Sequence, residues 1–354
     1  MKYFIKTFGC QMNFSDSERI QTFLHQNKLA QAKTIKTADL VILNTCGVRQ
    51  TAEDRAFGQV HNLRKNNPQV LIVITGCLAH RKDVKKKMKD KVDVFLPINK
   101  IQDLFKDLFT KDQSSTDKEG TKQAHYLKLK PQYKKKSSVF VPVMTGCNNF
   151  CSYCVVPYAR GQEWSRPIDD IIEEIGKTSQ EGCSEVLLLG QNVNSYKFKN
   201  YSFPLLLDLL AELYPTVMFT FLTSHPKDFS DELIEVIASR KNISRKIHLP
   251  IQSGSNKILK AMNRHYTQKH YLGIIDKIKT RIPDAEISTD VIVGFPGETL
   301  KAFQETKNVF KEVGFCKAYI NKYSPRPGTA AERLGNPIPC NEKKRRENIL
   351  RKLL

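Results

Sequence analysis

Short apolar runs that predict strands alternate with helical patterns along most of this chain, and this alternation constrains its fold most strongly. The first part has strand patterns at 3–8, 40–44, 70–75 and 92–96, and helical patterns at 15–26, 52–65 and 100–109. Strands separated by helices form parallel sheets, because each helix carries the chain back so that the next strand starts at the same end of the sheet. We therefore predict an α/β fold that begins with a doubly wound parallel sheet over residues 1–110.

The alternation resumes after residue 137 with six further strand patterns. They lie at 139–144, 185–189, 218–222, 246–250, 286–293 and 318–323, with helical patterns at 168–181, 203–213, 231–240, 271–281 and 300–313. Six consecutive βα units predict a partial (βα)6 barrel or a second doubly wound sheet. In both folds the functional edge is at the carboxyl ends of the strands.

Composition sets the remaining boundaries. Residues 111–137 are polar, rich in helix breakers and basic, which predicts a linker that is either a solvated tether or an RNA contact. Residues 138–340 then form the second domain, and residues 341–354 predict a basic helix.

The net charge points to a polyanionic partner. Lysine and arginine number 57 against 36 acidic residues, giving +21, and nucleic acid is the leading candidate, although a lysine-rich proteome would also explain it. No apolar run is long enough to span a bilayer, and no secretory signal is visible at the N-terminus. We therefore expect a cytoplasmic protein without a membrane partner.

Nine cysteines in a chain of this kind favour metal or redox chemistry over disulfides. Cys147, Cys151 and Cys154 follow the first strand of the second domain with C-x3-C-x2-C spacing. Three thiolates can hold three irons of a [4Fe-4S] cluster and leave the fourth iron open to a substrate. Zinc is the alternative, but it usually takes four ligands, and neither His125 nor Cys183 completes a recognisable finger.

A second set of cysteines lies just beyond three predicted strands of the first domain. Cys10, Cys46 and Cys77 are far apart in sequence, yet parallel strands end at one edge, so their thiols are expected to converge. Three buried core cysteines would be the simpler explanation. We predict a second three-cysteine cluster with an open iron of its own.

The C-x3-C-x2-C spacing followed by six βα units resembles the radical S-adenosylmethionine (SAM) superfamily. The resemblance narrows to the methylthiotransferase family, closest to its tRNA-modifying MiaB type, and runs from about residue 4 to the C-terminus. The motifs that carry it are Gly9-Cys10-Gln11-Met12-Asn13, Asn44-Thr45-Cys46, Thr75-Gly76-Cys77, 146–161, Ser165-Arg166-Pro167, 189–196, Ser224-His225-Pro226, 249–255, 293–298 and 323–329.

The resemblance implies conversion of N6-isopentenyladenosine, 3′ of the anticodon in tRNA, to its 2-methylthio derivative. It implies two [4Fe-4S] clusters and two SAM molecules, one giving the methyl group and the other the radical. An electron donor such as a flavodoxin or ferredoxin and a monomeric state are expected. By the family pattern, SAM contacts are expected at Gln191, Asn192, Ser224, Gln252 and Asp290.

Two alternatives stay open. A sister methylthiotransferase would act on threonylcarbamoyladenosine in tRNA or on a ribosomal protein, and a zinc-bearing RNA-binding protein would have no catalysis. The family usually carries a C-terminal TRAM barrel that grips tRNA, and this chain ends at Leu354 before one. We expect either a truncated chain or a tRNA grip that relies on the basic surface.

Other residues fit more than one interpretation. Phe150 and Tyr153 are expected either to shield the cluster or to stack on adenine. Three arginines are expected either to bind phosphates or SAM or to form salt bridges: Arg160, Arg166 and Arg326. Three cysteines without a matching pattern are expected to be structural: Cys183, Cys316 and Cys340.

Overall fold

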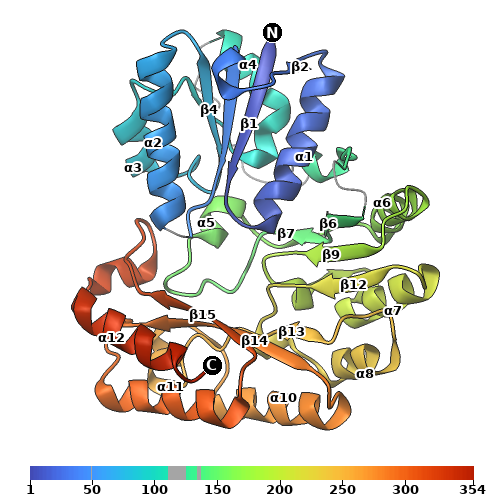
Figure 1. The fold of residues 1–354 in the computed structure, drawn as a ribbon, viewed down its shortest axis with the longest axis vertical. Helices are drawn as coiled ribbons and strands as arrows, with labels where there is room; N and C mark the ends of the chain where they lie inside the picture. Colours follow the sequence, from blue (N-terminus) through green and yellow to red (C-terminus); the bar gives the residue numbers. More distant parts are fainter. Residues whose placement is uncertain (49, 111–124, 134–136) are drawn as a thin grey trace. The chain divides into compact units, whose positions relative to one another are not determined.

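The computed structural model describes residues 1–48, 50–110, 125–133 and 137–354, and the chain divides into two compact units (Figure 1). The first unit is Met1–Lys135 with Thr145–Cys147 and Val155–Trp164, and the second is Lys136–Met144, Asn148–Cys154 and Ser165–Leu354. Most of the predicted linker, residues 111–124 and 134–136, lies outside the described residues. In the described part of the chain, no helix combines the length and apolar character needed to cross a membrane.

The first unit contains a five-stranded, wholly parallel sheet of order β2-β1-β3-β4-β5. Its strands are β1 (Lys2–Phe8), β2 (Ala30–Gln31), β3 (Leu40–Thr45), β4 (Leu71–Gly76) and β5 (Val94–Phe95). This is the doubly wound order in which the direction of winding reverses between β1 and β3. Sheets of this kind bind ligands beyond the carboxyl ends of the strands at that reversal.

Helices cover both faces of this sheet, which explains why its central strand is entirely apolar in the middle. In β3, Leu40 and Ile42 pack into one hydrophobic cluster, and Val41 and Leu43 pack into the other. The first cluster includes residues of α1 and of the segment that precedes α4, and the second includes residues of α2 and α3. The helices of this unit are α1 (Gln11–Gln26), α2 (Gln50–Asn66), α3 (Lys82–Met88), α4 (Leu104–Thr110) and α5 (Val156–Arg160), with 3-10 turns at Ile35–Thr37, Ile98–Asp103 and His125–Lys128.

The second unit contains six parallel strands in two hydrogen-bonded groups, β12-β9-β6 and β13-β14-β15. Its strands are β6 (Ser138–Pro142), β9 (Glu185–Leu189), β12 (Met218–Phe221), β13 (Lys246–His248), β14 (Glu286–Val293) and β15 (Lys317–Lys322). A parallel bridge between Phe219 and Ile243 lies at the junction of the two groups. The prediction of an α/β fold with parallel sheets is confirmed, and six strands follow one another as in a partial barrel (Figure 1).

Crossover helices pack outside these strands. The helices are α6 (Ile168–Gln180), α7 (Phe203–Leu213), α8 (Asp231–Ser239), α9 (Asn256–Ala261), α10 (Gln268–Arg281), α11 (Leu300–Val313) and α12 (Cys340–Arg351), with 3-10 turns at Val193–Ser195, Pro226–Asp228 and Ala330–Leu334. Short strands pair as β7 (Met144–Thr145) with β8 (Trp164–Ser165) and as β10 (Lys197–Phe198) with β11 (Tyr201–Ser202). In β14 every second residue is buried, so the strand has one closed and one more open face.

Candidate functional site

The three cysteines of the first unit lie at one edge of its sheet. Phe8, Thr45 and Gly76 are register partners across β1, β3 and β4, so the three strands end side by side. Cys46 and Cys77 follow directly and are buried, whereas Cys10 lies two residues beyond its strand and is exposed. The register therefore brings the three predicted ligands to the point where winding of the sheet reverses.

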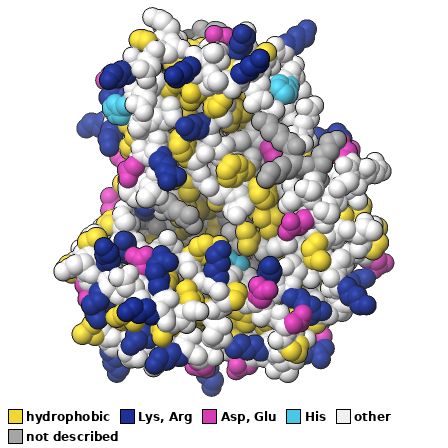
Figure 2. Space-filling view, in the orientation of Figure 1, with side chains coloured by type: hydrophobic (Ala, Val, Ile, Leu, Met, Phe, Trp, Pro, Cys, Tyr) yellow, Lys and Arg dark blue, Asp and Glu magenta, His cyan; other side chains and the backbone are white. Residues whose placement is uncertain are grey.

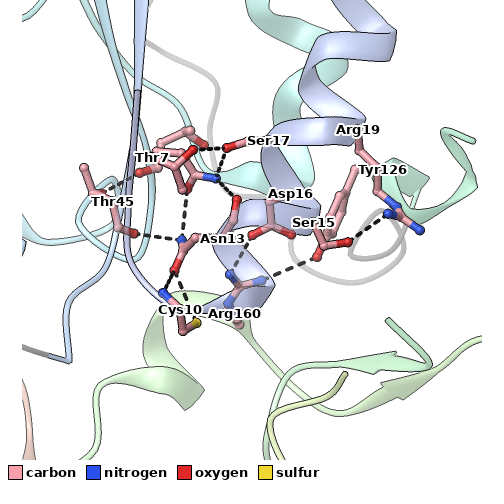
Figure 3. A network of polar contacts seen from close by, with 12 residues as sticks. Thr7, Cys10, Asn13, Ser15, Asp16, Ser17, Arg19, Thr45, Tyr126 and Arg160 are labelled. Carbon is pink, nitrogen blue, oxygen red and sulfur yellow. Dashed lines mark hydrogen bonds and ion pairs between the residues drawn. The ribbon is translucent and has the colours of Figure 1, made fainter. Parts of the chain in front are cut away.

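Asn13 links the loops that carry Cys10 and Cys46 (Figure 3). Its amide oxygen accepts the backbone N–H of Cys10 at 3.3 Å and the Cys10 thiol at 3.4 Å. Its amide nitrogen donates to Oδ1 of Asn44 at 3.0 Å and to the carbonyl oxygen of Thr45 at 3.2 Å. Nδ2 of Asn44 donates to the backbone oxygen of Asn13 at 2.7 Å, so the two asparagines fix the geometry of both cysteine loops.

Two glycines beside these cysteines are required by close approach. A Cβ atom on Gly76 would lie 2.3 Å from the carbonyl oxygen of Thr45, and Gly76 has a φ of +78°. A Cβ atom on Gly9 would lie 2.2 Å from Oδ1 of Asn13. A side chain at Gly76 would push against the end of β3 just before Cys46, and one at Gly9 would displace Asn13, which binds both cysteine loops.

Asn13→Ala is expected to lower the free energy of unfolding by about 2–4 kcal/mol, because it leaves buried partners in Asn44 and Thr45 unsatisfied. Urea unfolding followed by circular dichroism measures this loss. Asn66→Ala is the matched control, since Asn66 only donates to an exposed backbone oxygen within its own helix. Equal losses from the two variants would show that the Asn13 bonds do not support the loops.

A buried ion pair lies beside the same edge (Figure 3). Nη2 of Arg160 is 2.6 Å from Oδ2 of Asp16, and both side chains are almost fully buried. Nη1 of Arg160 also donates to the hydroxyl of Tyr126 at 3.5 Å. Burial raises the pKa of Tyr126, so the phenol stays protonated. Arg160 is thus a buried structural cation, in line with the salt-bridge interpretation of this residue.

The loop of the C-x3-C-x2-C motif is held by backbone contacts on both sides of its cysteines. In the first unit, the Cys147 N–H donates to the carbonyl oxygen of Gly161 at 3.1 Å. In the second unit, Ser152 binds the carbonyl oxygens of Ala261 and Met262 through its hydroxyl and its N–H. The segment after α9 therefore fixes the part of the loop that bears Cys151 and Cys154.

All nine cysteines are free thiols. Among the described residues, no three histidine, cysteine, aspartate or glutamate side chains already form a group that could hold a metal ion. The two predicted ligand sets therefore stay predictions, based on the spacing of Cys147, Cys151 and Cys154 and on the strand ends of the first unit.

Buried polar atoms without partners gather after two neighbouring strands of the second unit, β9 and β12. These atoms are Oε1 of Gln191, Oδ1 of Asn192, Oδ1 and Nδ2 of Asn194, Oγ of Ser224 and Nε2 of His225. Native proteins rarely leave such groups unsatisfied, so their concentration at the carboxyl ends of strands indicates a polar ligand. Donors and acceptors both occur in the set, which suits a ligand with amino, carboxylate and hydroxyl groups such as SAM.

His225 enters this set as a neutral imidazole. Burial, reinforced by the positive charges of Arg264 and Lys227, lowers its pKa to about 2. Nδ1 accepts the backbone N–H of Lys227 at 3.2 Å, so the proton lies on the unpartnered Nε2. His225 therefore offers a hydrogen-bond donor without a charge.

The other two predicted SAM contacts have different surroundings. Gln252 is buried and has a φ of +65°, an unusual conformation that its backbone bonds to β14 maintain. The carboxylate of Asp290 lies 3.0 Å from Nε2 of His248, whose Nδ1 lies 3.0 Å from Oγ of Ser288. Asp290 thus already has a partner, and its contact with SAM stays a prediction.

Several residues with more than one interpretation now have defined surroundings. Arg166 is buried against Glu174 at 2.8 Å. Cys183 and Cys316 donate to backbone oxygens at 3.1 Å and 3.2 Å, and burial raises the pKa of both thiols. Tyr153 packs against an apolar cluster of the second unit, while Phe150 is half exposed.

The basic residues of the chain divide into exposed and buried sets. Figure 2 shows lysine and arginine side chains scattered over the drawn surface of each unit. In α12, however, Lys343 is buried and donates to the carbonyl oxygen of Tyr323 at 2.8 Å, and Arg346 pairs with Glu298 at 2.6 Å. These two cations attach the helix to the second unit and are not available to a polyanion.

Sequence reasoning missed side chains that support the predicted ligands. Asn13 and Asn44 stood within quoted motifs without a role, and the partnerless atoms of Asn194 and His225 are visible only after folding. Asn263 donates to the carbonyl oxygens of Asn149 and Phe150, 114 and 113 residues away. No local pattern signals such a contact.

Both units contain segments that match known protein families. The radical SAM superfamily matches residues 141–310, and the family described as "Uncharacterized protein family UPF0004" matches residues 2–97. A tRNA-2-methylthio-N(6)-dimethylallyladenosine synthase of Endomicrobium trichonymphae is 39% identical over 99% of this chain and 83% of its own length. A synthase of the same name from Thermodesulfovibrio yellowstonii is 42% identical over 95% of this chain and 79% of its own.

Solved structures with the same fold are much more distant in sequence. The radical SAM methyltransferase TsrM from Kitasatospora setae, with cobalamin and a [4Fe-4S] cluster bound, has a TM-score of 0.65 and 11% identity over 94% of this chain and 77% of its own. The cobalamin-dependent radical SAM enzyme OxsB has a TM-score of 0.61 and 11% identity over 99% of this chain and 56% of its own. At this identity the likeness concerns the fold alone.

Proposed function

This chain belongs to the family of tRNA-2-methylthio-N(6)-dimethylallyladenosine synthases, and we propose that it adds a methylthio group to N6-isopentenyladenosine 3′ of the anticodon in tRNA. It is a radical SAM methylthiotransferase, with SAM and one [4Fe-4S] cluster as cofactors. The net charge of +21 suits a tRNA substrate, because exposed lysines and arginines neutralise phosphates. Because its proposed substrate is tRNA, we place the enzyme in the cytoplasm.

Cys147, Cys151 and Cys154 hold the radical-generating cluster in this proposal. Three cysteine ligands leave one iron for the amino and carboxylate groups of SAM. When bound, the cluster would supply the electron that splits SAM, and with it the radical chemistry needed to replace a hydrogen of the adenine base. Gln191, Asn192, Ser224 and Gln252 orient SAM, joined by the unpartnered groups of Asn194 and His225.

Cys10, Cys46 and Cys77 hold the second cluster, which carries the sulfur. The observation that supports this most directly is the register of β1, β3 and β4, which brings these residues to one edge of the first unit. A flavodoxin or ferredoxin serves as electron donor, and the chain acts as a monomer.

The test is anaerobic reconstitution followed by incubation with SAM, dithionite and isopentenylated tRNA. We expect about eight irons per chain, from two clusters of four, and a 2-methylthio nucleoside detected by mass spectrometry. Transfer RNA without the isopentenyl group is the control. SAM cleavage without this product would indicate the substrate of a sister methylthiotransferase. Bound zinc in place of iron would contradict the assignment as a radical SAM enzyme.

A further inference from the structure

Arg264 is a buried cation that contacts the sulfur of a predicted cluster ligand. Its side chain is only 8% exposed, and Nη1 donates to Sγ of Cys151 at 3.4 Å. Nη2 donates to the carbonyl oxygen of Pro250 at 3.3 Å, and Nε donates to the hydroxyl of Tyr266 at 3.2 Å. All three nitrogens of the guanidinium group therefore point at fixed atoms, one of which is a thiol sulfur.

The environment of Arg264 differs from that of three other buried arginines of this chain. Arg160, Arg166 and Arg346 each form an ion pair with a buried carboxylate, at 2.6, 2.8 and 2.6 Å. Within the described ranges, no aspartate or glutamate forms a hydrogen bond or an ion pair with Arg264. A buried charge is costly unless it is paired, so Arg264 is expected to have an anionic partner, and among the described residues no carboxylate takes that place.

We infer that Arg264 is the counter-charge of the [4Fe-4S] cluster bound through Cys151 and that it raises the reduction potential of this cluster. The inference rests on the proposed function, which makes Cys151 a cluster ligand. Three thiolates give the cluster a net negative charge, and reduction adds one more. A cation fixed beside a ligand sulfur in a buried site therefore stabilises the reduced form more than the oxidised form.

The position of this cation is fixed by the surrounding segment. The Arg264 N–H donates to the carbonyl oxygen of Leu259 at 2.9 Å, and the hydroxyl of Tyr266 donates to that of Ile251 at 2.6 Å. Asn263, the preceding residue, binds the cysteine loop through two carbonyl oxygens. Because this segment holds both the loop and the guanidinium group, Arg264 acts as a positioning residue, and it does not need to touch SAM.

The experiment measures the potential of one cluster at a time. The parent protein carries alanine at Cys10, Cys46 and Cys77, so only the radical-SAM cluster of about four irons is loaded. Arg264→Gln, Arg264→Met and Arg264→Lys are made in this parent. Arg240→Gln is the control, because Arg240 pairs with Asp208 and Glu212 near the surface. The readouts are iron content, the melting temperature of the apo-protein and the midpoint potential by EPR-monitored titration, without tRNA.

We expect both neutral variants to lower the ratio of reduced to oxidised cluster at least tenfold at a fixed potential, a negative shift of 59 mV or more. Arg264→Lys keeps the charge and should stay within threefold of the parent, as should Arg240→Gln. Apo-proteins of the neutral variants should melt within about 3 °C of the parent, since they lose an uncompensated charge. Folded neutral variants that lose iron while Arg264→Lys retains it would also support the inference.

Two results would overturn it. One is an unchanged potential in a loaded neutral variant, and the other is a large fall in melting temperature in both neutral apo-proteins, which would make Arg264 a structural residue. A parent protein that binds no iron would instead contradict the proposed function, so failure of one claim is distinguishable from failure of the other.

Discussion

Cys147→Ala is expected to lower the rate of SAM cleavage to 5′-deoxyadenosine by more than about 1,000-fold, or about 4 kcal/mol in transition-state stabilisation. The motif supplies only three thiolates, so the loss of one leaves a cluster with two protein ligands and no defined open iron. The rate is measured by liquid chromatography and mass spectrometry with dithionite as reductant. Neither methylthiolated tRNA nor methionine from cleavage should exceed the background.

Cys316→Ala is the matched control for this prediction. Cys316 belongs to neither predicted ligand set; it is exposed to the solvent, whereas Cys147 is buried, and its thiol donates to the carbonyl oxygen of Ile287 within the second unit. The alanine variant should bind the same iron as the wild type and cleave SAM within twofold of its rate. A Cys147→Ala protein that cleaved SAM as fast as this control would remove Cys147 from the ligand set.

The sequence was sufficient to predict most of the strands and the sheet edge at which Cys10, Cys46 and Cys77 lie. β14 and α11 have the predicted bounds, 286–293 and 300–313, because their apolar periods of two and 3.6 residues are regular. Parallel strands end at a common edge, so the alignment of Cys10, Cys46 and Cys77 followed from topology. These predictions depended on the local apolar periodicity and on the geometry of parallel sheets.

Predictions were less accurate where local signals were unusual. The first helix was expected at residue 15, but α1 begins at Gln11. Its N-cap is Cys10, which makes reciprocal bonds with Asn13 in place of the usual serine, threonine or aspartate. The two-residue edge strand β2 is exposed and has no apolar period to reveal it. In both cases the residues that fix the element are ones that propensities do not favour.

Contacts between distant segments could not be predicted from the sequence. The segment Val155–Trp164 follows the cysteine motif in sequence but packs with the first unit, where Arg160 meets Asp16. Arg264 reaches Cys151 across 113 residues. Such contacts depend on the path of the whole chain and on the packing of particular side chains, so no periodicity or spacing signals them.

The complementary prediction concerns Cys10→Ala, which should separate the two chemistries. We expect iron to fall from about eight to about four per chain, because only the second cluster loses a ligand. SAM cleavage should stay within threefold of the wild type, since the C-x3-C-x2-C motif is unchanged. The 2-methylthio nucleoside should fall by at least about 100-fold, or about 2.7 kcal/mol, because no cluster is left to supply sulfur.

Cys10 is the best of its three cysteines for this test, because its exposed thiol adds little to the core, whereas Cys46 and Cys77 are buried. The Cys10→Ala and Cys147→Ala proteins should thus have reciprocal defects, one keeping SAM cleavage without product and the other losing both. Wild-type amounts of 2-methylthio product from Cys10→Ala would mean that the aligned strand ends of the first unit do not form a sulfur-carrying site. Loss of SAM cleavage in the same variant would mean that the two cysteine sets do not act separately.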